Sequence, residues 1–464
     1  MSKKGKITLI ILLVTIILAA IGGTAYYLYQ KDAPKRELAA LGYNEQQTTV
    51  ITKNNLADEV INAGQSSLFI YALENNISNI DCKDYYLLSD KDIPEGKTAK
   101  ELFDVINKLK ESGYTSEEAY VMVNNLDFET IYTVLRTVQP ADLELFTTAI
   151  CHDYSVEDSL LLAQGNMELM NMLNEEKITF ENVKPMLTKG YSAEEIIQLY
   201  NAMEPDDYAF IKSMKYIPEL ALLVGMDNFE MDKLPRYLMS LRSNRAELND
   251  VINWVNNDND YIPADEIDYS AMYHDEEIPE NYASYTACIN KQYALPADYV
   301  PSDLEQLPAG YRVLSHPMRH VAANAFMNMS DGSVVAGYER ILAQSNYRSY
   351  EHQKSLYDEY VFQDGVALAD TYSARPGHSE HQTGLVTDIG TSSLDMLYFE
   401  NYSGYEWVLE NAHRYGFIQR YPEGKEYITG YEYESWHFRY VGVESATVMY
   451  EHDWTLDEYS LLFD

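Results

Sequence analysis

The chain has 464 residues, too many for one compact core and enough for two or three domains. Hydrophobic residues make up 46% and charged residues 23%, which excludes disordered, collagen-like and coiled-coil proteins. Asp and Glu number 73 against 34 Lys and Arg, so the formal net charge of −39 excludes a protein that binds nucleic acid through its phosphates. Three cysteines are too few for a disulfide framework.

Residues 1–30 are predicted to form a Lys-rich tip and a transmembrane anchor. Lys3, Lys4 and Lys6 precede an apolar stretch, residues 7–29, that carries no charge. As a helix this stretch would span about 35 Å, enough to cross a hydrocarbon core. The positive-inside rule then predicts a single-pass cell-membrane protein with a cytoplasmic N-terminus and the chain after about residue 30 outside the cell. A cleaved signal peptide is the alternative, although the stretch is long for one.

Residues 36–250 are predicted to form an all-α, repeat-like region. Four segments share one pattern, in which a Tyr and a helix-capping residue precede an acid or amide three positions after the cap. The pattern is typical of the capping box at a helix start, with the Tyr as a candidate hydrophobic staple. The segments are Tyr43-Asn44-x-x-Gln47, Tyr114-Thr115-x-x-Glu118, Tyr154-Ser155-x-x-Asp158 and Tyr191-Ser192-x-x-Glu195.

The spacing of these segments predicts about two short helices per repeated unit. The Tyr residues lie 71, 40 and 37 positions apart, and the first interval fits two units. A plain helical domain whose helices use similar caps is the alternative. The region offers no catalytic constellation, so its expected role is to hold the next domain away from the membrane or to bind a protein or wall partner.

A polar linker is predicted over residues 251–283, where Asn, Asp, Glu and Pro cluster. The folded stretch over residues 284–464 mixes strand-like alternation, as in residues 426–440, with helical periods, as in residues 318–329. This mixture predicts an α+β domain. Eight of the ten histidines lie in this domain, so the chemistry is expected there.

Two short segments of this domain carry the candidate chemistry. They supply two imidazoles, a carboxylate at a fixed offset from the first His, and a carboxylate beside the second. A catalytic zinc site has the same inventory, namely three protein ligands, an open position for water and a base. The segments are Ser379-Glu380-His381-Gln382-Thr383-Gly384-Leu385-Val386-Thr387-Asp388 and Glu434-Ser435-Trp436-His437.

The spacing of Glu434 and His437 constrains the local geometry. On a regular strand, side chains three positions apart point to opposite faces. A bend or bulge near residues 435–436, or a single helical turn, is therefore required if both are to face one metal. Spacing alone leaves an alternative open, in which His381 is a loop residue, Asp388 caps a turn and His437 is a core histidine.

Over about residues 285–464 the chain resembles the VanY-type zinc D-alanyl-D-alanine carboxypeptidases. The family pattern is Ser-x-His-x-x-Gly-x-Ala-x-Asp followed by Glu-x-Trp-His, and this chain departs from it at Val386, where Ala is usual. Three flanking blocks match as well: Asn290-Lys291-x-Tyr293-x-Leu295-Pro296 with Pro301, Tyr347-Arg348-Ser349-Tyr350-x-x-Gln353, and Phe417-x-x-Arg420-Tyr421-Pro422-x-Gly424-Lys425. The resemblance implies the small α+β fold of this group, with zinc on a central antiparallel sheet.

The resemblance also implies roles for the residues of the two segments. His381, Asp388 and His437 match the ligands of one Zn²⁺ ion per catalytic domain. Glu434 matches the catalytic base that activates water. Because three protein ligands suffice for a catalytic zinc, the adjacent His378 is expected to be a loop or rim residue.

Four further residues match positions that face the substrate. Arg348 matches the arginine that faces the substrate carbonyl and terminal carboxylate, and a guanidinium suits this task because it donates two parallel hydrogen bonds. Ser379, Gln353 and Tyr421 match substrate-contacting positions.

The predicted function is a membrane-anchored, extracellular zinc carboxypeptidase that removes the C-terminal D-alanine from peptidoglycan stem peptides. One alternative is an LD-carboxypeptidase that acts on tetrapeptide stems. Another is a non-catalytic protein that binds or scaffolds the cell wall, although the intact ligand set with Glu434 argues against it. No nucleic-acid partner is expected.

Overall fold

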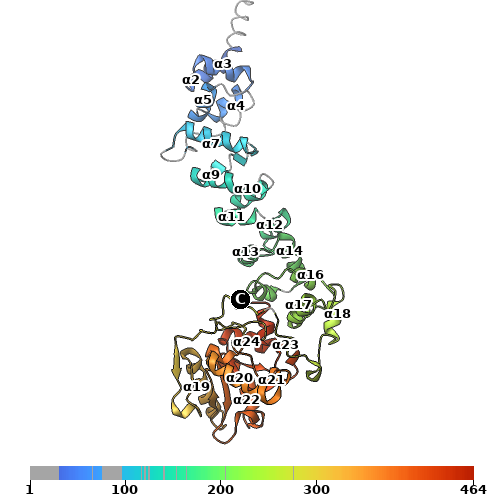
Figure 1. Ribbon diagram of the computed structural model, residues 1–464. Coiled ribbons are helices and arrows are strands. Elements are labelled where there is room, and N and C mark those ends of the chain that lie inside the picture. The colour runs from blue at the N-terminus through green and yellow to red at the C-terminus, as the bar shows by residue number, and fades with distance from the viewer. Residues whose placement is uncertain are drawn as a thin grey trace, which may run out of the picture. The chain divides into compact units, whose positions relative to one another are not determined.

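Figure 1 shows the computed structural model of the chain. It describes residues 31–463, except for residues 76–92 and shorter gaps at 65, 94–96, 116–117, 120–121, 124–125, 139–141, 153, 164, 204 and 275. The described residues fall into two compact units, the first ending at Glu194 and the second beginning at Glu195. Each unit has its own fold.

The first unit consists of short helices that follow one another in chain order (Figure 1). They are α2 (Ala33–Ala40), α3 (Glu45–Lys53), α4 (Ala57–Ala63), α5 (Ser67–Glu74), α7 (Ala99–Glu111), α9 (Phe128–Thr137), α10 (Leu143–Cys151), α11 (Val156–Leu162), α12 (Met167–Asn174) and α13 (Phe180–Lys189). Buried apolar side chains from the part of this unit up to Ala163 form one core, rich in Leu, Ile, Val and Phe, that begins at Leu38. The predicted helical character of this region is therefore observed, while its origin as a repeat array stays a prediction.

The caps explain where several of these helices begin. Asn44 accepts a hydrogen bond from the Gln47 amide at 2.9 Å, and the Gln47 side chain accepts one from the Asn44 amide at 2.8 Å. Thr115 and Glu118 make the same reciprocal pair, at 3.2 and 2.6 Å. The capping boxes predicted at these two positions are present, and each satisfies amides that the first helical turn leaves free.

The second unit begins with helices and continues as an α+β domain. Helix α14 (Ala193–Ala202) crosses the boundary, and the helices α15 (Pro205–Ile211), α16 (Leu220–Val224), α17 (Leu234–Arg242) and α18 (Val251–Asn256) follow, with short 3-10 helices η3 (Met231–Lys233) and η4 (Ala264–Glu266). The α+β part contains β1 (Leu304–Gln306), η5 (Ala309–Tyr311), β2 (Pro317–Arg319), α19 (His320–Val335), β3 (Leu342–Ser345), α20 (Tyr350–Asp364), α21 (Val366–Tyr372), η6 (Glu380–Thr383), β4 (Val386–Gly390), η7 (Met396–Asn401), α22 (Tyr405–Asn411), η8 (Ala412–Tyr415), β5 (Phe417–Tyr421), α23 (Glu426–Thr429), β6 (Glu434–Tyr440), α24 (Val443–Glu451) and α25 (Leu456–Ser460).

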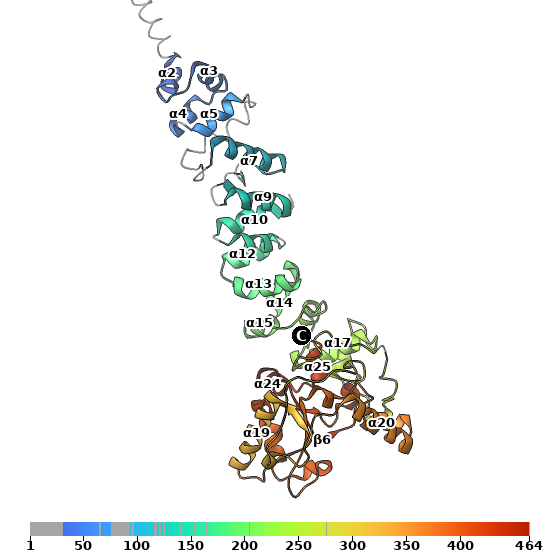
Figure 2. The same ribbon diagram turned by 60° about the vertical axis from the view of Figure 1, so that its left-hand side comes forward.

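Four strands form the central sheet of the second unit, in the order β3-β4-β6-β5, and every neighbouring pair is antiparallel. Figure 2 shows β6 in the middle of this unit, between α19 and α20. One face of the sheet packs against α19, because Leu385, Ile389 and Phe438 share a core with Phe326. The predicted α+β fold and its antiparallel sheet are confirmed. Strand alternation places Asp388 and His437 on the opposite face.

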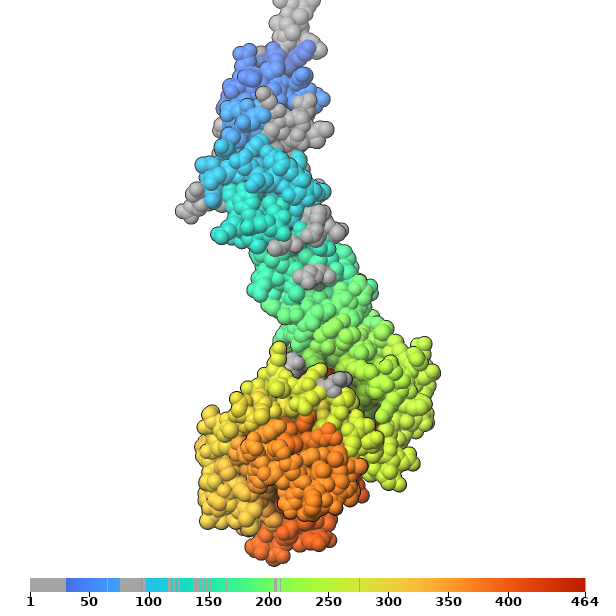
Figure 3. All heavy atoms as spheres, in the orientation of Figure 1, coloured from blue at the N-terminus to red at the C-terminus, as the bar shows by residue number. Residues whose placement is uncertain are grey.

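The segment before the sheet, within the range predicted as a linker, is tied closely to the α+β part. The Ser270 hydroxyl donates to Asp370 at 2.7 Å. The Glu277 amide donates to the Gln292 carbonyl at 3.0 Å, and the Ala294 amide donates to the Glu277 carbonyl at 2.8 Å. The space-filling view in Figure 3 shows the second unit as closely packed atoms around the yellow and orange parts of the chain.

The predicted single-pass membrane location requires correction. A membrane-spanning helix needs about 20 predominantly apolar residues. The longest described helix, α19, has 16 residues, and none of the helices in the described part of the chain is long and apolar enough to cross a membrane. The predicted anchor over residues 7–29 lies outside the described residues.

Candidate active site

The central sheet brings two of the predicted ligands face to face. Asp388 of β4 and His437 of β6 are direct partners in the antiparallel register. His437 Nδ1 lies 3.1 Å from Asp388 Oδ1, and both side chains are buried. The neighbours Ile389 and Phe438 point into the core on the other face, so strand alternation fixes where the two polar side chains lie.

His381 reaches the same point from the turn before β4. It lies in η6, and Gly384, the residue that follows this 3-10 helix, has a φ of 67°. A Cβ at Gly384 would lie 2.8 Å from Leu304 Cδ2, so both the backbone angle and the space favour glycine. The turn places His381 Nε2 3.4 Å from Asp388 Oδ2.

Strand β6 contains the bulge that the spacing of Glu434 and His437 requires. Gln419 pairs with Phe438 and Tyr421 pairs with Glu434, so residues 435–437 lie opposite a single residue of β5. The irregularity lets both side chains face the same point, and Glu434 Oε2 lies 3.3 Å from His437 Nδ1. The side chain of Glu434 is 14% exposed against 5% for His437, so the carboxylate borders the open side of the cluster.

The three predicted ligands fit a metal ion. One ligand atom from each of His381, Asp388 and His437 lies within 4.8 Å of the others, and all three residues are buried. Asp388 Oδ1 finds no hydrogen-bond partner among the described residues. Two imidazole nitrogens and one carboxylate oxygen are a donor set that Zn²⁺ accepts, with a fourth position left open.

A backbone carbonyl sets the tautomer of His381. His381 Nδ1 lies 2.5 Å from the Asn346 carbonyl oxygen, which can only accept a hydrogen bond. Nδ1 therefore carries the proton, and Nε2 presents its lone pair to the cluster. Burial lowers the pKa of His381 to about 3, so the imidazole is neutral at physiological pH. The sequence carries no signal for Asn346, because any residue offers a carbonyl.

Burial raises the pKa of the Glu434 carboxyl to about 7. His437 lowers this pKa, the Asp388 carboxylate raises it, and the Arg348 guanidinium lowers it. A carboxyl group with a pKa near neutrality can both accept and return a proton at physiological pH. Glu434 therefore lies beside the candidate ligands with a proton affinity that suits acid–base chemistry.

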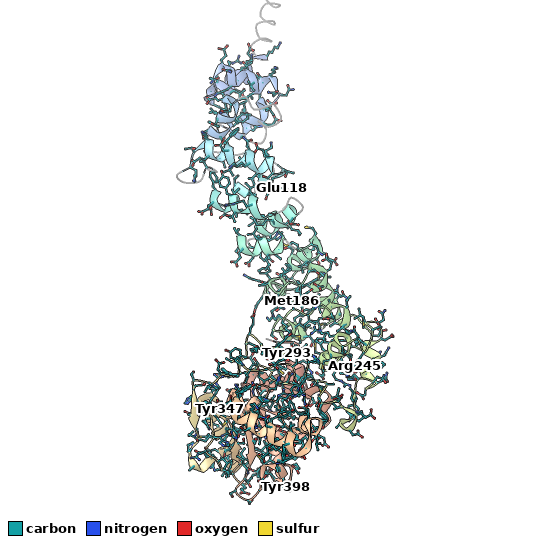
Figure 4. The ribbon with its side chains drawn as sticks, in the orientation of Figure 1. Glu118, Met186, Arg245, Tyr293, Tyr347 and Tyr398 are labelled. Carbon is teal, nitrogen blue, oxygen red and sulfur yellow. The ribbon has the colours of Figure 1, made fainter. Side chains whose placement is uncertain are left out.

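Arg348 is held beside this cluster by hydrogen bonds from its amide and its guanidinium. Its amide donates to the His381 carbonyl at 3.2 Å, and its Nη1 donates to Gln353 Oε1 at 2.6 Å. The buried Gln353 also donates through Nε2 to the Ala374 carbonyl at 2.7 Å, so both ends of its amide are engaged. Figure 4 labels Tyr347, the residue before Arg348, in the second unit.

The other predicted site residues lie close by. Ser379 is buried at the start of η6, and the Tyr421 ring lies 4.9 Å from the His437 ring. His378, expected to be a loop or rim residue, lies in the loop before η6, where it is buried and its Nδ1 lies 2.8 Å from the Asn290 carbonyl. His378 is not part of the cluster that could hold a metal. The eight predicted site residues thus share one unit, and their catalytic roles stay predictions.

A buried charge network behind the site was not predicted. Glu380, between Ser379 and His381, is fully buried with Arg420 and Arg439, and Arg420 also pairs with Asp457. The available signal was the presence of charged residues inside the matched segments. Nothing local in the sequence indicates that they meet, because Glu380 and Arg420 are 40 positions apart.

Comparison with known proteins identifies the family. The model of the VanY family, described as D-alanyl-D-alanine carboxypeptidase, matches residues 315–443. A putative carboxypeptidase of Bacillus subtilis (strain 168), YodJ, is 44% identical over 191 residues, which are 39% of this chain and 69% of that protein. The chain belongs to the VanY family.

Two solved structures are also similar to this VanY-family chain. The first is the LdcB LD-carboxypeptidase, which is 42% identical. The match covers 41% of this chain and 91% of the LdcB chain, with a TM-score of 0.39. The second is a D,D-pentapeptidase VanY from a VanB-type vancomycin resistance cassette, solved as its E175A mutant in complex with Zn(II). It is 34% identical, the match covers 38% of this chain and 98% of that chain, and the TM-score is 0.33.

Family membership confirms the predicted enzyme class. The chain is a hydrolase of the metallopeptidase class, and at the coarser level its function is that of a peptidoglycan carboxypeptidase.

Proposed function

We propose that this VanY-family enzyme uses one zinc ion to remove the C-terminal D-alanine from peptidoglycan stem peptides. The observation that carries the proposal is the convergence of His381, Asp388 and His437 within 4.8 Å, with the Glu434 carboxylate 3.3 Å from His437. This arrangement combines three ligands with a separate base, as metal-dependent hydrolysis requires. The family description supports D-alanyl-D-alanine as the substrate class.

The side chains of the cluster divide the chemistry between them. His381, Asp388 and His437 would hold zinc, which when bound supplies a Lewis acid that polarises a carbonyl and acidifies water. Glu434 accepts a proton from the attacking water and returns it to the amine that leaves. A pKa raised by burial to about 7 suits both halves of this transfer.

Arg348 would recognise the C-terminal carboxylate of the substrate. Its guanidinium can donate two parallel hydrogen bonds to a carboxylate. Gln353 fixes Nη1 of Arg348 at 2.6 Å and is itself fixed by the Ala374 carbonyl, so the guanidinium is oriented before substrate binds. Ser379 and Tyr421 would contact the peptide beside it.

We assign the chemistry to a catalytic domain at residues 284–464, preceded by a connecting segment at residues 251–283. All eight proposed site residues lie in this domain. The helical region over residues 36–250 takes no part in bond cleavage in this proposal, and its role would be the binding of a partner.

Defined stem peptides test the proposed function. The purified full chain is incubated with a pentapeptide stem ending in D-Ala-D-Ala and with the tetrapeptide stem ending in a single D-Ala, with and without a zinc chelator. Mass spectrometry then identifies the products. We expect loss of one alanine from the pentapeptide, abolished by the chelator and restored by added zinc.

Each other result has a defined meaning. Cleavage of the tetrapeptide alone would contradict DD-specificity and assign LD-carboxypeptidase activity. Cleavage that resists the chelator would contradict the metal mechanism. Absence of any product with zinc present would favour a non-catalytic wall-binding protein.

A further inference from the structure

The carboxylate of Glu380 is buried between two arginines behind the candidate metal site. Its side chain has 0% exposure, as have those of Arg420 and Arg439. Glu380 Oε1 accepts a hydrogen bond from Arg420 Nε at 2.9 Å and lies 2.8 Å from Arg439 Nη1. Burying a charge costs free energy unless an opposite charge pairs with it. The two arginines provide this pairing at Oε1.

The second oxygen of this carboxylate accepts no hydrogen bond from the two arginines. Glu380 Oε2 is buried and has no hydrogen-bond partner among the described residues. Glu380 Oε2 lies 3.8 Å from His437 Nε2, and this nitrogen is also buried without a partner in the described part of the chain. Buried polar atoms in native proteins are rarely left unsatisfied, and here two of them face each other.

The surroundings of the other ring nitrogen, Nδ1, determine which nitrogen of His437 carries the proton. His437 Nδ1 lies 3.1 Å from Asp388 Oδ1 and 3.3 Å from Glu434 Oε2, so Nδ1 is the nitrogen that faces the candidate ligand and base and that a metal would take. A neutral imidazole that gives one nitrogen to a metal carries its proton on the other. That proton points at Glu380 Oε2, and a shift of about 1 Å brings the two atoms to hydrogen-bond distance.

We propose that Glu380 is a positioning residue that fixes the tautomer and the orientation of His437 toward the metal. The inference rests on the proposed function, because it concerns the same zinc site. Arg420 and Arg439 hold the carboxylate in place, and the carboxylate accepts the Nε2 proton of His437. A carboxylate that accepts a hydrogen bond from a metal-ligating imidazole raises the basicity of the imidazole and fixes the orientation of its ring. Loss of such a carboxylate typically lowers metal affinity about 10–100-fold.

The two imidazole ligands are thus supported in different ways. His381 donates from Nδ1 to the neutral carbonyl of Asn346, whereas His437 would donate from Nε2 to a charged carboxylate. A hydrogen bond to a charged acceptor is stronger than one to a neutral carbonyl. We therefore expect the loss of the Glu380 side chain to weaken metal binding through His437. No side chain plays the same part for His381, whose acceptor is a backbone carbonyl.

A purely structural role for Glu380 is the competing explanation, and a matched variant separates the two. Asp457 is the other carboxylate of the network, and its Oδ2 accepts from Arg420 Nη1 at 2.6 Å. Asp457→Asn and Glu380→Gln each remove one negative charge from the same buried arginine. Only Glu380→Gln removes the carboxylate that faces His437.

The test measures zinc affinity of the full chain by competition with a chromophoric chelator, alongside the thermal unfolding of each metal-free variant. We expect Glu380→Gln to weaken zinc binding about 10–100-fold and Asp457→Asn to change it by less than about threefold, although both lower the unfolding temperature. Wild-type zinc affinity in Glu380→Gln, or an equal loss in Asp457→Asn, would overturn the proposal.

A measurement on the unaltered chain covers the case in which Glu380→Gln fails to fold. Nitrogen-15 NMR of the zinc-loaded protein reports which nitrogen of His437 carries the proton. We expect a slowly exchanging proton on Nε2, whereas a proton on Nδ1 would refute the inference. Wild-type protein that binds no zinc at all would instead refute the proposed function.

Discussion

Asp388 and His437 oppose each other across two strands, while His381 completes the cluster from a separate turn. The three side chains come from three elements, and a site with three protein ligands has no spare one. The proposed zinc site therefore requires each of the three side chains, and the contribution of each can be measured by replacing it alone.

We expect His381→Ala, Asp388→Ala and His437→Ala each to lose stoichiometric zinc and carboxypeptidase activity. His378→Ala is the matched control, because His378 is a buried histidine three positions from His381 that lies outside the cluster. Zinc content by elemental analysis and hydrolysis of the pentapeptide stem are measured on the same samples. Full zinc content in any of the three variants would show that the replaced residue is not a ligand.

The segment that precedes the sheet contacts the loop whose Ala374 carbonyl holds Gln353. Tyr273, from residues 251–283, accepts a hydrogen bond from the Arg375 amide at 3.1 Å, and its ring lies 5.1 Å from that of His378. Arg375 follows Ala374, whose carbonyl fixes Gln353. A chain of contacts thus leads from the segment through residues 374–375 and Gln353 to Arg348.

We expect Tyr273→Phe, which removes only the hydroxyl, to raise KM for the pentapeptide about threefold to tenfold with little change in kcat, because a loosened Gln353 leaves Arg348 less ordered. Tyr261→Phe, at a partly exposed ring of the same segment, serves as the control. Steady-state kinetics decide between them. An unchanged KM in Tyr273→Phe would mean that the segment packs against the domain without ordering Gln353 and Arg348.

The elements differ in how far the sequence alone predicts them. The capping boxes at Asn44 and Thr115 depend on residues three positions apart, so their pattern is visible locally. The bulge in β6 follows from requiring Glu434 and His437 to face one point. By contrast, the contacts of Glu380 with Arg420 and of Tyr273 with Arg375 join segments 40 and 102 positions apart, and only the fold brings them together.

At the scale of the whole molecule, the proposed chemistry belongs to one of two compact units. The first unit has its own apolar core, and all proposed catalytic and ligand residues lie beyond Glu195. A unit with its own core can fold without the rest of the chain.

We therefore expect a fragment of residues 195–464 to hydrolyse soluble pentapeptide with kcat/KM within about threefold of the full chain, a difference of less than about 1 kcal/mol in transition-state stabilisation. The comparison uses the same peptide, zinc concentration and buffer for both proteins. A loss of more than about a hundredfold, from a fragment that is folded by circular dichroism, would mean that residues before 195 contribute to catalysis.

The most direct measurement is made on Glu434→Gln, with zinc content and kcat determined on one preparation. The amide keeps the shape of the side chain but cannot accept a proton near neutral pH, and general acid–base steps are worth about 10²–10⁴-fold. We expect zinc to remain at one equivalent and kcat to fall by at least that factor. Loss of zinc would make Glu434 a ligand, and a near-normal kcat would mean that another group activates the water; either result contradicts the division between three ligands and a separate base.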